Sequence, residues 1–213
     1  MTGVDSHWHG LSCFEIKVNK PLGPTLFRQL GDAARRLRES GLADGAVSSY
    51  GSIAAYWDQP PATEQIQQQV TEVVLQSLYL QPDSLAVSRQ DHTFSVRYDG
   101  DDLHELAEKC ALSAREVVER HTAAEYVVAA VGFMPHFAYL WGLDPLIASP
   151  RKMSPRVRVP IGSLGIAGQQ TGVYPAESPG GWQLIGRVSP EACKAICPQL
   201  KIGDIVRFRE IRE

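Results

Sequence analysis

Glycine and proline are concentrated in residues 132–187, and this concentration constrains the fold more than any other feature of the sequence. These 56 residues hold 9 of the chain's 18 glycines and 7 of its 14 prolines. Proline fixes φ and lacks an amide hydrogen, whereas glycine reaches backbone conformations that other residues avoid. Long helices are therefore excluded here, and the pattern predicts short strands between tight turns. We call residues 132–187 the Gly/Pro-rich segment.

The Gly/Pro-rich segment is basic, although the whole chain carries a net charge of −3 at pH 7. Its only acidic residues are Asp144 and Glu177, and its basic residues are Arg151, Lys152, Arg156, Arg158 and Arg187. An acidic chain with so small a basic stretch does not fit non-specific nucleic-acid binding. Cations beside exposed glycine amides indicate an anion site, but a loop-rich β-barrel would use glycine and proline in the same way.

The remaining composition is that of a soluble globular protein, with 44% hydrophobic and 21% charged residues. No apolar run approaches the roughly 18 residues that a membrane span requires. Residues 1–10 lack the basic and then apolar pattern of a secretory signal. Four cysteines are too few and too scattered for a disulfide framework. We expect a cytoplasmic protein that binds neither nucleic acid nor membranes.

The N-terminal part of the chain predicts one α/β domain, residues 11–89, after a disordered terminus, residues 1–10. Alternating apolar residues predict a strand at 13–18, and Pro24 opens a helix with Gly41 at its C-terminal cap. Further elements follow as strands at 46–50 and 52–57, a helix from Thr63 and a strand at 85–88. The order strand, helix, strand, strand, helix, strand is the ferredoxin-like plan.

Two histidines near the N-terminus have the spacing of a metal chelate. His7 and His9 flank Trp8, and two imidazoles two residues apart can bind one ion. Because chain termini are usually mobile, we expect a frayed terminus here rather than a metal site.

The C-terminal part, residues 90–213, predicts a β-barrel domain. A strand at 93–98 precedes two short helices, of which the second begins with a capping box formed by Ser113 and Glu116. A buried strand at 126–131 leads into the Gly/Pro-rich segment, where four short strands between turns are typical of a small barrel. A short helix from Ser189 and a strand at 205–211 complete the chain.

Two arginines of the Gly/Pro-rich segment are candidates for anion binding. Arg151 and Arg156 lie in a Pro-Arg-x-x-x-Pro-Arg motif, where two prolines fix the separation of two guanidinium groups. Such placement suits a carboxylate or phosphate, although two surface arginines on a turn would have the same pattern. The motif Ser178-Pro-Gly-Gly-Trp182 can form an anion-binding nest of amides or simply a tight hairpin.

Other motifs have structural explanations that compete with functional ones. His121 stands at a predicted helix end, where it is either a general base or a partner of the helix dipole. Gly162, Gly165 and Gly168 lack the spacing of a phosphate loop and are interpreted as turn glycines. Cys193 and Cys197 lie one helical turn apart, and we interpret them as buried thiols rather than metal ligands.

A long series of glycine, proline, arginine and tryptophan positions resembles one known family. The matching residues are Gly132-Phe133, Pro135, Phe137-Ala-Tyr-Leu140, Pro150-Arg151, Pro155-Arg156, Val159-Pro160, Gly162-Ser163, Gln170-Thr-Gly-Val-Tyr-Pro175 and Ser178-Pro-Gly-Gly-Trp-Gln-Leu-Ile-Gly-Arg187. This pattern is similar to the allophanate hydrolase subunit 1 family, which includes the B-type subunits of 5-oxoprolinases and the sporulation-kinase inhibitor KipI.

The resemblance implies a ferredoxin-like N-terminal domain, a cyclophilin-like C-terminal β-barrel and a role as the B-type subunit of a 5-oxoprolinase. That complex opens 5-oxo-L-proline to L-glutamate with ATP, together with an A-type subunit and with a C-type subunit from the allophanate hydrolase subunit 2 family. ATP would bind with the partner subunits, and we expect no tightly bound cofactor or metal in this chain. The alternatives are a KipI-like inhibitor of a sensor histidine kinase and a carboxyltransferase component acting on a urea-like substrate.

Within that interpretation the candidate site residues have distinct roles. His121 is the candidate for proton transfer, Arg151 and Arg156 bind anions, and Gln170, Tyr174 and Trp182 contact the substrate. One position departs from the family pattern Gly-Phe-x-Pro-Gly-Phe, because His136 replaces the second glycine. A non-glycine residue there costs about 1 kcal/mol if its φ is positive.

Overall fold

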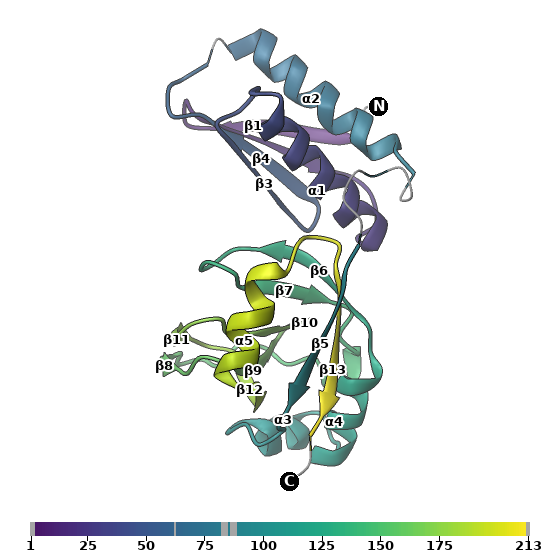
Figure 1. The fold of residues 1–213 in the computed structure, drawn as a ribbon, viewed down its shortest axis with the longest axis vertical. Helices are drawn as coiled ribbons and strands as arrows, with labels where there is room; N and C mark the ends of the chain where they lie inside the picture. Colours follow the sequence, from purple (N-terminus) through teal and green to yellow (C-terminus); the bar gives the residue numbers. More distant parts are fainter. Residues whose placement is uncertain (1–2, 62, 82–84, 86–88, 212–213) are drawn as a thin grey trace. The chain divides into compact units, whose positions relative to one another are not determined.

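The computed structural model describes residues 3–61, 63–81, 85 and 89–211, which form a mixture of helices and strands. The chain divides into two compact units, Met1–Ser88 and Arg89–Glu213, so the division falls one residue before the one expected at 89/90. We describe each unit separately, as the N-terminal and the C-terminal unit (Figure 1).

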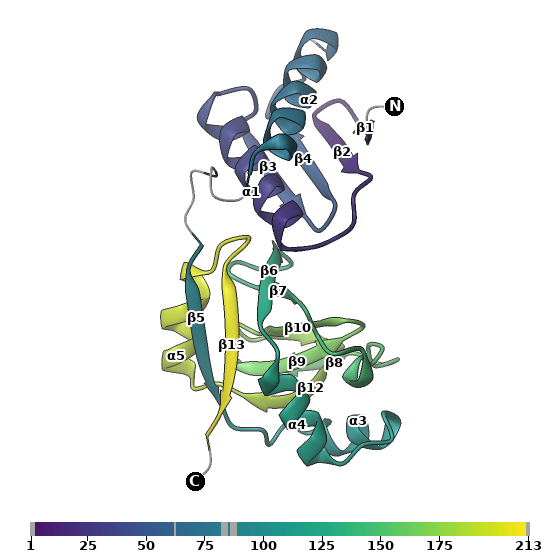
Figure 2. The same cartoon turned by 90° about the vertical axis from the view of Figure 1, so that its right-hand side faces the viewer.

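The N-terminal unit is an antiparallel sheet covered on one face by two helices (Figure 2). Its strands are β1 (Val4–His9), β2 (Cys13–Val18), β3 (Gly45–Ser49) and β4 (Ser52–Tyr56), in the spatial order β1-β2-β4-β3. Helix α1 (Pro24–Glu39) begins at the predicted proline, and Gly41 follows its end with a φ of 72°. Helices α1 and α2 (Thr63–Tyr79) contribute apolar residues to the same buried core as β2 and β4.

Strand β1 contradicts the prediction of disorder for Val4–His9. All six of its residues pair with β2, and Gly10 with a φ of 68° allows the turn between the two strands. Trp8 stabilises the hairpin because its ring packs 5.0 Å from Phe14 and 5.6 Å from Trp57, measured between centroids. The strand predicted at 85–88 falls largely outside the described residues, so it stays a prediction.

The C-terminal unit is built around a second, larger set of strands, joined by short helices. Its elements in chain order are β5 (Asp91–Val96), α3 (Leu103–Lys109), α4 (Ala114–Ala123), β6 (Tyr126–Val131), β7 (Ala138–Trp141), the 3-10 helix η2 (Pro145–Ile147), β8 (Arg156–Val159), β9 (Ser163–Ala167), β10 (Gln170–Val173), β11 (Ser178–Gly180), β12 (Gln183–Arg187), α5 (Pro190–Ile196), η3 (Cys197–Gln199) and β13 (Ile205–Glu210). The short strands predicted in the Gly/Pro-rich segment are confirmed. Helices α3 and α4 lie near the carboxyl ends of β5 and β13 (Figure 1).

The strands of the C-terminal unit follow one another in an almost continuous circuit. Strands β6, β7, β10, β9 and β12 pair in that order, all antiparallel. Strand β13 pairs with β6 on one side and, in parallel, with β5 on the other. Beyond the end of β5, Arg97 forms an antiparallel bridge with Arg187 at the end of β12. Strands β8 and β11 form a separate ribbon.

Glycines with a positive φ form the turns next to strands in the Gly/Pro-rich segment. Gly162 has a φ of 82°, and a Cβ atom there would overlap the carbonyl oxygen of Val188. Gly168 has a φ of 58° between β9 and β10, so both positions confirm the interpretation as turn glycines. Gly165 differs, because it lies within β9, where a side chain would meet the Cβ of Trp182. Among the described residues, no helix is long and apolar enough to cross a bilayer.

The capping box of α4 is present as predicted and provides a test of the C-terminal unit's stability. The Ser113 hydroxyl accepts from the Glu116 amide at 3.2 Å, and the Ser113 amide donates to the Glu116 carboxylate at 2.8 Å. We expect Ser113→Ala to lower the free energy of unfolding by about 1 kcal/mol, because one amide of the first helical turn loses its acceptor. Urea unfolding followed by circular dichroism measures this loss. Ser113→Thr keeps the hydroxyl and should stay close to the wild type; an equal loss in both variants would contradict the explanation.

Candidate anion-binding site

A buried carboxylate, Asp102, organises the basic part of the C-terminal unit. Its Oδ1 accepts hydrogen bonds from Arg156 Nη2 at 2.6 Å and from Lys152 Nζ at 2.7 Å. Its Oδ2 accepts from the backbone amide of Leu184 at 2.7 Å, and its side chain is only 3% exposed. Asp102 therefore connects the start of α3 with strand β12 and with the two basic side chains around β8.

The hydrogen-bond donors around Asp102 favour its ionised form. Burial alone would raise the pKa of Asp102, but the hydrogen bonds from Arg156, Lys152 and the Leu184 amide outweigh it and lower the pKa. The hydrogen bond with Asp102 in turn raises the pKa of Lys152. Arg156 is therefore already paired with an ionised carboxylate, which the sequence analysis did not anticipate. No local signal pointed to this pairing, because Asp102 precedes α3 without a side-chain capping bond and its partners Lys152 and Arg156 are 50 and 54 positions away.

Arg151, unlike Arg156, is not paired with a carboxylate in the described part of the chain. Its side chain is exposed, and it makes no hydrogen bond or ion pair with any residue that the structure describes. Its neighbour Lys152 is held in place, because the Lys152 amide donates to the carbonyl of Gly181 at 2.7 Å. The rigid connection at Lys152 limits where the Arg151 guanidinium can reach.

The charge of Arg151 acts on the phenol of Tyr174. Burial raises the pKa of Tyr174 to about 12, while a hydrogen bond with the Trp182 backbone and the positive charge of Arg151 work in the opposite direction. The Tyr174 hydroxyl lies beside Gly180, where an added Cβ would come within 2.5 Å of it. Arg151 therefore stands near the Ser178–Trp182 motif.

Buried aromatic rings pack next to the Ser178–Trp182 motif. The ring of Phe137 lies 5.3 Å from both Tyr174 and Trp182 and 5.0 Å from Tyr139, in edge-to-face arrangements. Tyr174 is 1% exposed and Trp182 is 5% exposed. Both residues belong to a buried cluster that supports the surface, so in this conformation they do not offer a face to a substrate.

Gln170 begins β10, opposite Trp141 on one side and Ala167 on the other, whereas Tyr174 follows the end of the same strand. Four residues of extended chain separate the two by about 13 Å. The structure thus brings Arg151, Arg156, Tyr174 and Trp182 into one region, with Gln170 at the other end of β10 from Tyr174.

His121 lies in the core of the C-terminal unit, fully buried. Because the Thr171 hydroxyl donates to the carbonyl of Gly165 at 3.0 Å, its oxygen accepts from His121 Nε2 at 3.0 Å. His121 Nδ1 then accepts from the Tyr98 hydroxyl at 2.8 Å. These contacts fix one neutral tautomer, and burial lowers the pKa of His121 to about 3. A neutral imidazole is not a charged partner of the helix dipole, and its burial gives no support to the predicted role in proton transfer.

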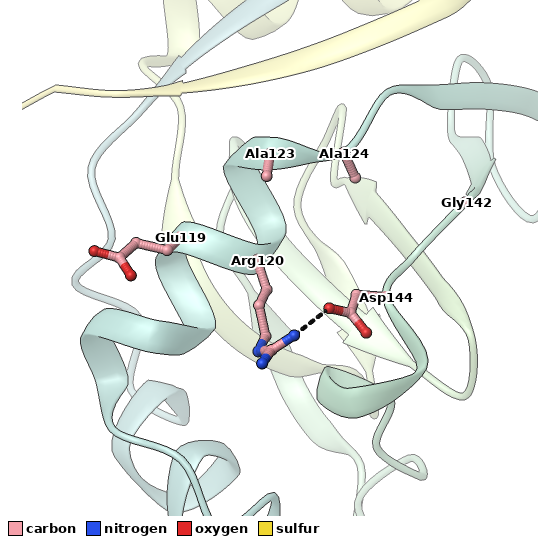
Figure 3. Close-up of a pocket in the computed structure, with 6 residues that line it drawn as sticks. All are labelled: Glu119, Arg120, Ala123, Ala124, Gly142 and Asp144. Carbon is pink, nitrogen blue, oxygen red and sulfur yellow. Dashed lines mark hydrogen bonds and ion pairs between the residues drawn. The ribbon is translucent and has the colours of Figure 1, made fainter.

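A surface depression near the end of α4 contains none of the predicted site residues (Figure 3). It is lined by Glu119, Arg120, Ala123, Ala124, Gly142 and Asp144. Arg120 Nη1 donates to Asp144 Oδ2 at 2.8 Å, as the dashed line in Figure 3 shows. The hydrogen bonds from the Leu146 amide and from Arg120 lower the pKa of Asp144. Arg120 and Asp144 neutralise each other's charge. The depression is therefore a weaker candidate for an anion-binding site than the region around Arg151.

Cys193 and Cys197 are buried thiols, as the sequence analysis predicted. Their sulfur atoms lie 3.5 Å apart, and Cys193 donates to the carbonyl of Tyr174 at 3.4 Å. These contacts place the pair in the buried core of the C-terminal unit.

The loop between β6 and β7 contains the unusual His136. Its φ is 67°, and Phe133 in the same loop has a φ of 72°. The amide of Gly132 donates to the carbonyl of Phe137 at 3.0 Å, which closes the loop. His136 therefore occupies the left-handed conformation that glycine adopts without strain.

Comparison with known proteins gives matches over most of the chain. Residues 4–193 match the family described as carboxyltransferase domain, subdomain C and D. The chain is 47% identical over 136 residues to the B subunit of 5-oxoprolinase from Bacillus subtilis, covering 60% of this chain and 55% of that protein. It is 49% identical over 114 residues to the B subunit of 5-oxoprolinase from Escherichia coli O157:H7, covering 51% of each. The chain thus spans about half the length of the curated relatives it matches.

A solved structure aligns with nearly the whole chain. The crystal structure of a conserved uncharacterized protein from Pyrococcus horikoshii aligns with 98% of this chain and 98% of that chain, at 30% sequence identity and a TM-score of 0.54.

The buried ion pairs of Asp102 predict a pH-dependent loss of stability. We expect Asp102→Asn to reduce the free energy of unfolding by about 2 to 4 kcal/mol, less than for fully buried pairs because Lys152 and Arg156 are partly exposed. The pKa of Asp102 is lower in the folded chain than its unfolded value of about 3.9. The stabilisation is therefore complete above about pH 4 and is lost as the pH falls through the lower folded pKa.

Urea unfolding at several pH values from neutral to strongly acidic tests this expectation. Asp99→Asn is the matched control, because Asp99 forms an exposed ion pair with Arg187 and should contribute less than about 1 kcal/mol. If Asp102→Asn loses as little as Asp99→Asn, the central role of the Asp102 carboxylate is wrong.

The left-handed conformation of His136 predicts a stabilising substitution. We expect His136→Gly to raise the free energy of unfolding by about 1 kcal/mol, because glycine adopts a positive φ without steric cost. His136→Ala removes the imidazole but keeps the backbone strain, so it should give no such gain. Thermal and urea unfolding of the three proteins measure the difference. A gain in the alanine variant equal to that in the glycine variant would assign the effect to the side chain instead.

Proposed function

The chain belongs to the family of carboxyltransferase domains, subdomains C and D, and from this premise we propose that it is the B-type subunit of a 5-oxoprolinase complex. Support comes from its 47% and 49% identity to curated proteins that are named as B subunits of 5-oxoprolinase. The proposed reaction is the ATP-dependent opening of 5-oxo-L-proline to L-glutamate. The proposed partners are the A-type and C-type subunits, the proposed compartment is the cytoplasm, and ATP would bind with the partner subunits.

The chemistry of this reaction requires cations fixed near a substrate carboxylate. A lactam carbonyl is a poor electrophile, and transfer of the γ-phosphoryl group of ATP to its oxygen, with ADP leaving, makes the ring carbon open to attack by water. Cleavage of the ring C–N bond then gives an acyl phosphate, which a second water hydrolyses to glutamate and phosphate. The protein must hold the carboxylate, the phosphorylated oxygen and the water together, which is a matter of positioning and electrostatics. A guanidinium group suits this task because it binds a carboxylate or phosphate through two parallel hydrogen bonds.

The single observation that supports a site in this chain is the difference between its two predicted arginines. Arg156 is neutralised by Asp102 at 2.6 Å, whereas Arg151 is exposed and has no partner in the described part of the chain. We assign anion binding to Arg151. Asp102, Arg156 and Lys152 would then position the backbone around it, and the buried rings of Tyr174 and Trp182 would support it from below.

The same proposal includes the finer fold of the two units, ferredoxin-like and cyclophilin-like. The circuit of paired strands supports a closed barrel, because the bridge between Arg97 and Arg187 joins the two ends of the row from β5 to β12. In the N-terminal unit, the helices on one face of an antiparallel sheet support a ferredoxin-like arrangement.

The test is reconstitution of the complex. The chain is co-expressed with candidate A-type and C-type partners, and glutamate release from 5-oxoproline is followed with and without ATP. We expect turnover that requires ATP and all components, and we expect Arg151→Ala to reduce kcat/KM at least about tenfold, which corresponds to about 1.4 kcal/mol of lost transition-state binding. Turnover no greater than that of the partners alone would refute the proposal.

Arg158→Ala is the matched control for the site. Arg158 is also an exposed arginine of the same segment, but its Nε donates to Glu177 at 2.6 Å. This variant should retain wild-type activity. If Arg151→Ala and Arg158→Ala have the same activity as the wild type, the assignment of Arg151 is wrong even if the complex is active.

A further inference from the structure

Three side chains with metal-binding groups meet on one face of the β1–β2 hairpin. His7 and His9 are two residues apart in β1, so their side chains lie on the same face of the strand. Glu15 in β2 is the direct register partner of His7. The opposite face of the hairpin carries Trp8 and Phe14, which pack into the core of the N-terminal unit. The three groups therefore project from a backbone whose orientation the core fixes.

The distances among these groups fit a single ion. Glu15 Oε2 lies 3.1 Å from His7 Nε2 and 2.8 Å from His9 Nε2. One ligand atom from each of the three residues lies within 4.8 Å of the others. In a tetrahedral zinc site with bonds of about 2.1 Å, neighbouring ligand atoms are about 3.4 Å apart. Small side-chain rotations would thus bring all three atoms to bonding distance of one metal ion.

The two imidazole rings also lie close enough to share one ion. The centroids of His7 and His9 are 4.3 Å apart, on the same face of β1. Metal ions bind imidazole in its neutral form and carboxyl groups as carboxylates, so metal binding by these three side chains would be weakened at acidic pH.

We propose that His7, His9 and Glu15 bind one divalent transition-metal ion, with Zn²⁺ as the expected ion. Two imidazoles and one carboxylate form a donor set that zinc sites use, and three protein ligands leave a fourth position for water or for a group from another molecule. Side-chain exposures of 43% for His7 and 53% for His9 leave the site accessible from solvent. The bound ion would connect β1 to β2 and stabilise the hairpin.

The first experiment titrates the tag-free full chain with ZnCl₂ by isothermal calorimetry. We expect one Zn²⁺ per chain. Loss of a hydrogen-bonding partner of a ligand already costs about 10- to 100-fold in metal affinity, so His7→Ala, His9→Ala and Glu15→Gln should each weaken binding at least that much. His104→Ala removes another exposed histidine and should bind Zn²⁺ like the wild type. Cys13→Ser tests the thiol opposite His9 in the hairpin and should also retain binding.

A second experiment on the wild-type chain does not depend on how the variants fold. Imidazole nitrogen resonances of uniformly ¹⁵N-labelled protein are recorded during the Zn²⁺ titration, and we expect those of His7 and His9 to shift together, saturating at one equivalent. No saturable binding, or saturable binding without a change at His7 and His9, would overturn the proposal. Equal Zn²⁺ affinity in the wild type and in a folded His7→Ala/His9→Ala variant would overturn it as well.

Discussion

The buried carboxylate of Asp102 is the interaction on which the C-terminal unit's basic region depends. Its two oxygens accept from Arg156, Lys152 and the Leu184 amide, at the start of helix α3. An ionised carboxylate away from water is tolerated only when its hydrogen-bonding capacity is filled. Arg156 and Lys152 therefore stabilise the structure by pairing with Asp102. Of the two arginines predicted to bind anions, only Arg151 is not paired with Asp102.

Local patterns in the sequence predicted much of the fold. The proline at the start of α1, the capping box of α4 and the turn glycines Gly162 and Gly168 each act within a few residues of their position, so their effects can be derived without knowing the tertiary structure. The short strands of the Gly/Pro-rich segment follow from the same kind of local rule. Periodicity and turn signals also predicted a division into two units, and the family resemblance implied the same division.

Contacts between distant residues were the part that the sequence did not show. Asp102 meets Arg156 across 54 positions, and His121 meets Thr171 across 50, so neither pairing has a local signature. These pairings change the expected roles: Arg156 is neutralised and His121 is buried. Strand β1 was missed for a related reason, because the ring of Trp8 is stabilised by Phe14 and Trp57 rather than by its own neighbours.

The chain of hydrogen bonds from Tyr98 through His121 and Thr171 to the carbonyl of Gly165 runs in one direction. The final acceptor is a main-chain carbonyl oxygen, which can accept a hydrogen bond but cannot donate one. The Thr171 hydroxyl must therefore donate to it, and this fixes which atom donates at each earlier hydrogen bond. Replacing one of the three side chains alone would leave a donor or an acceptor unmatched in the interior. Substitutions at these three positions should therefore occur together. Relatives that lack the histidine at the position of His121 are expected to differ at the position of Tyr98 or Thr171 as well.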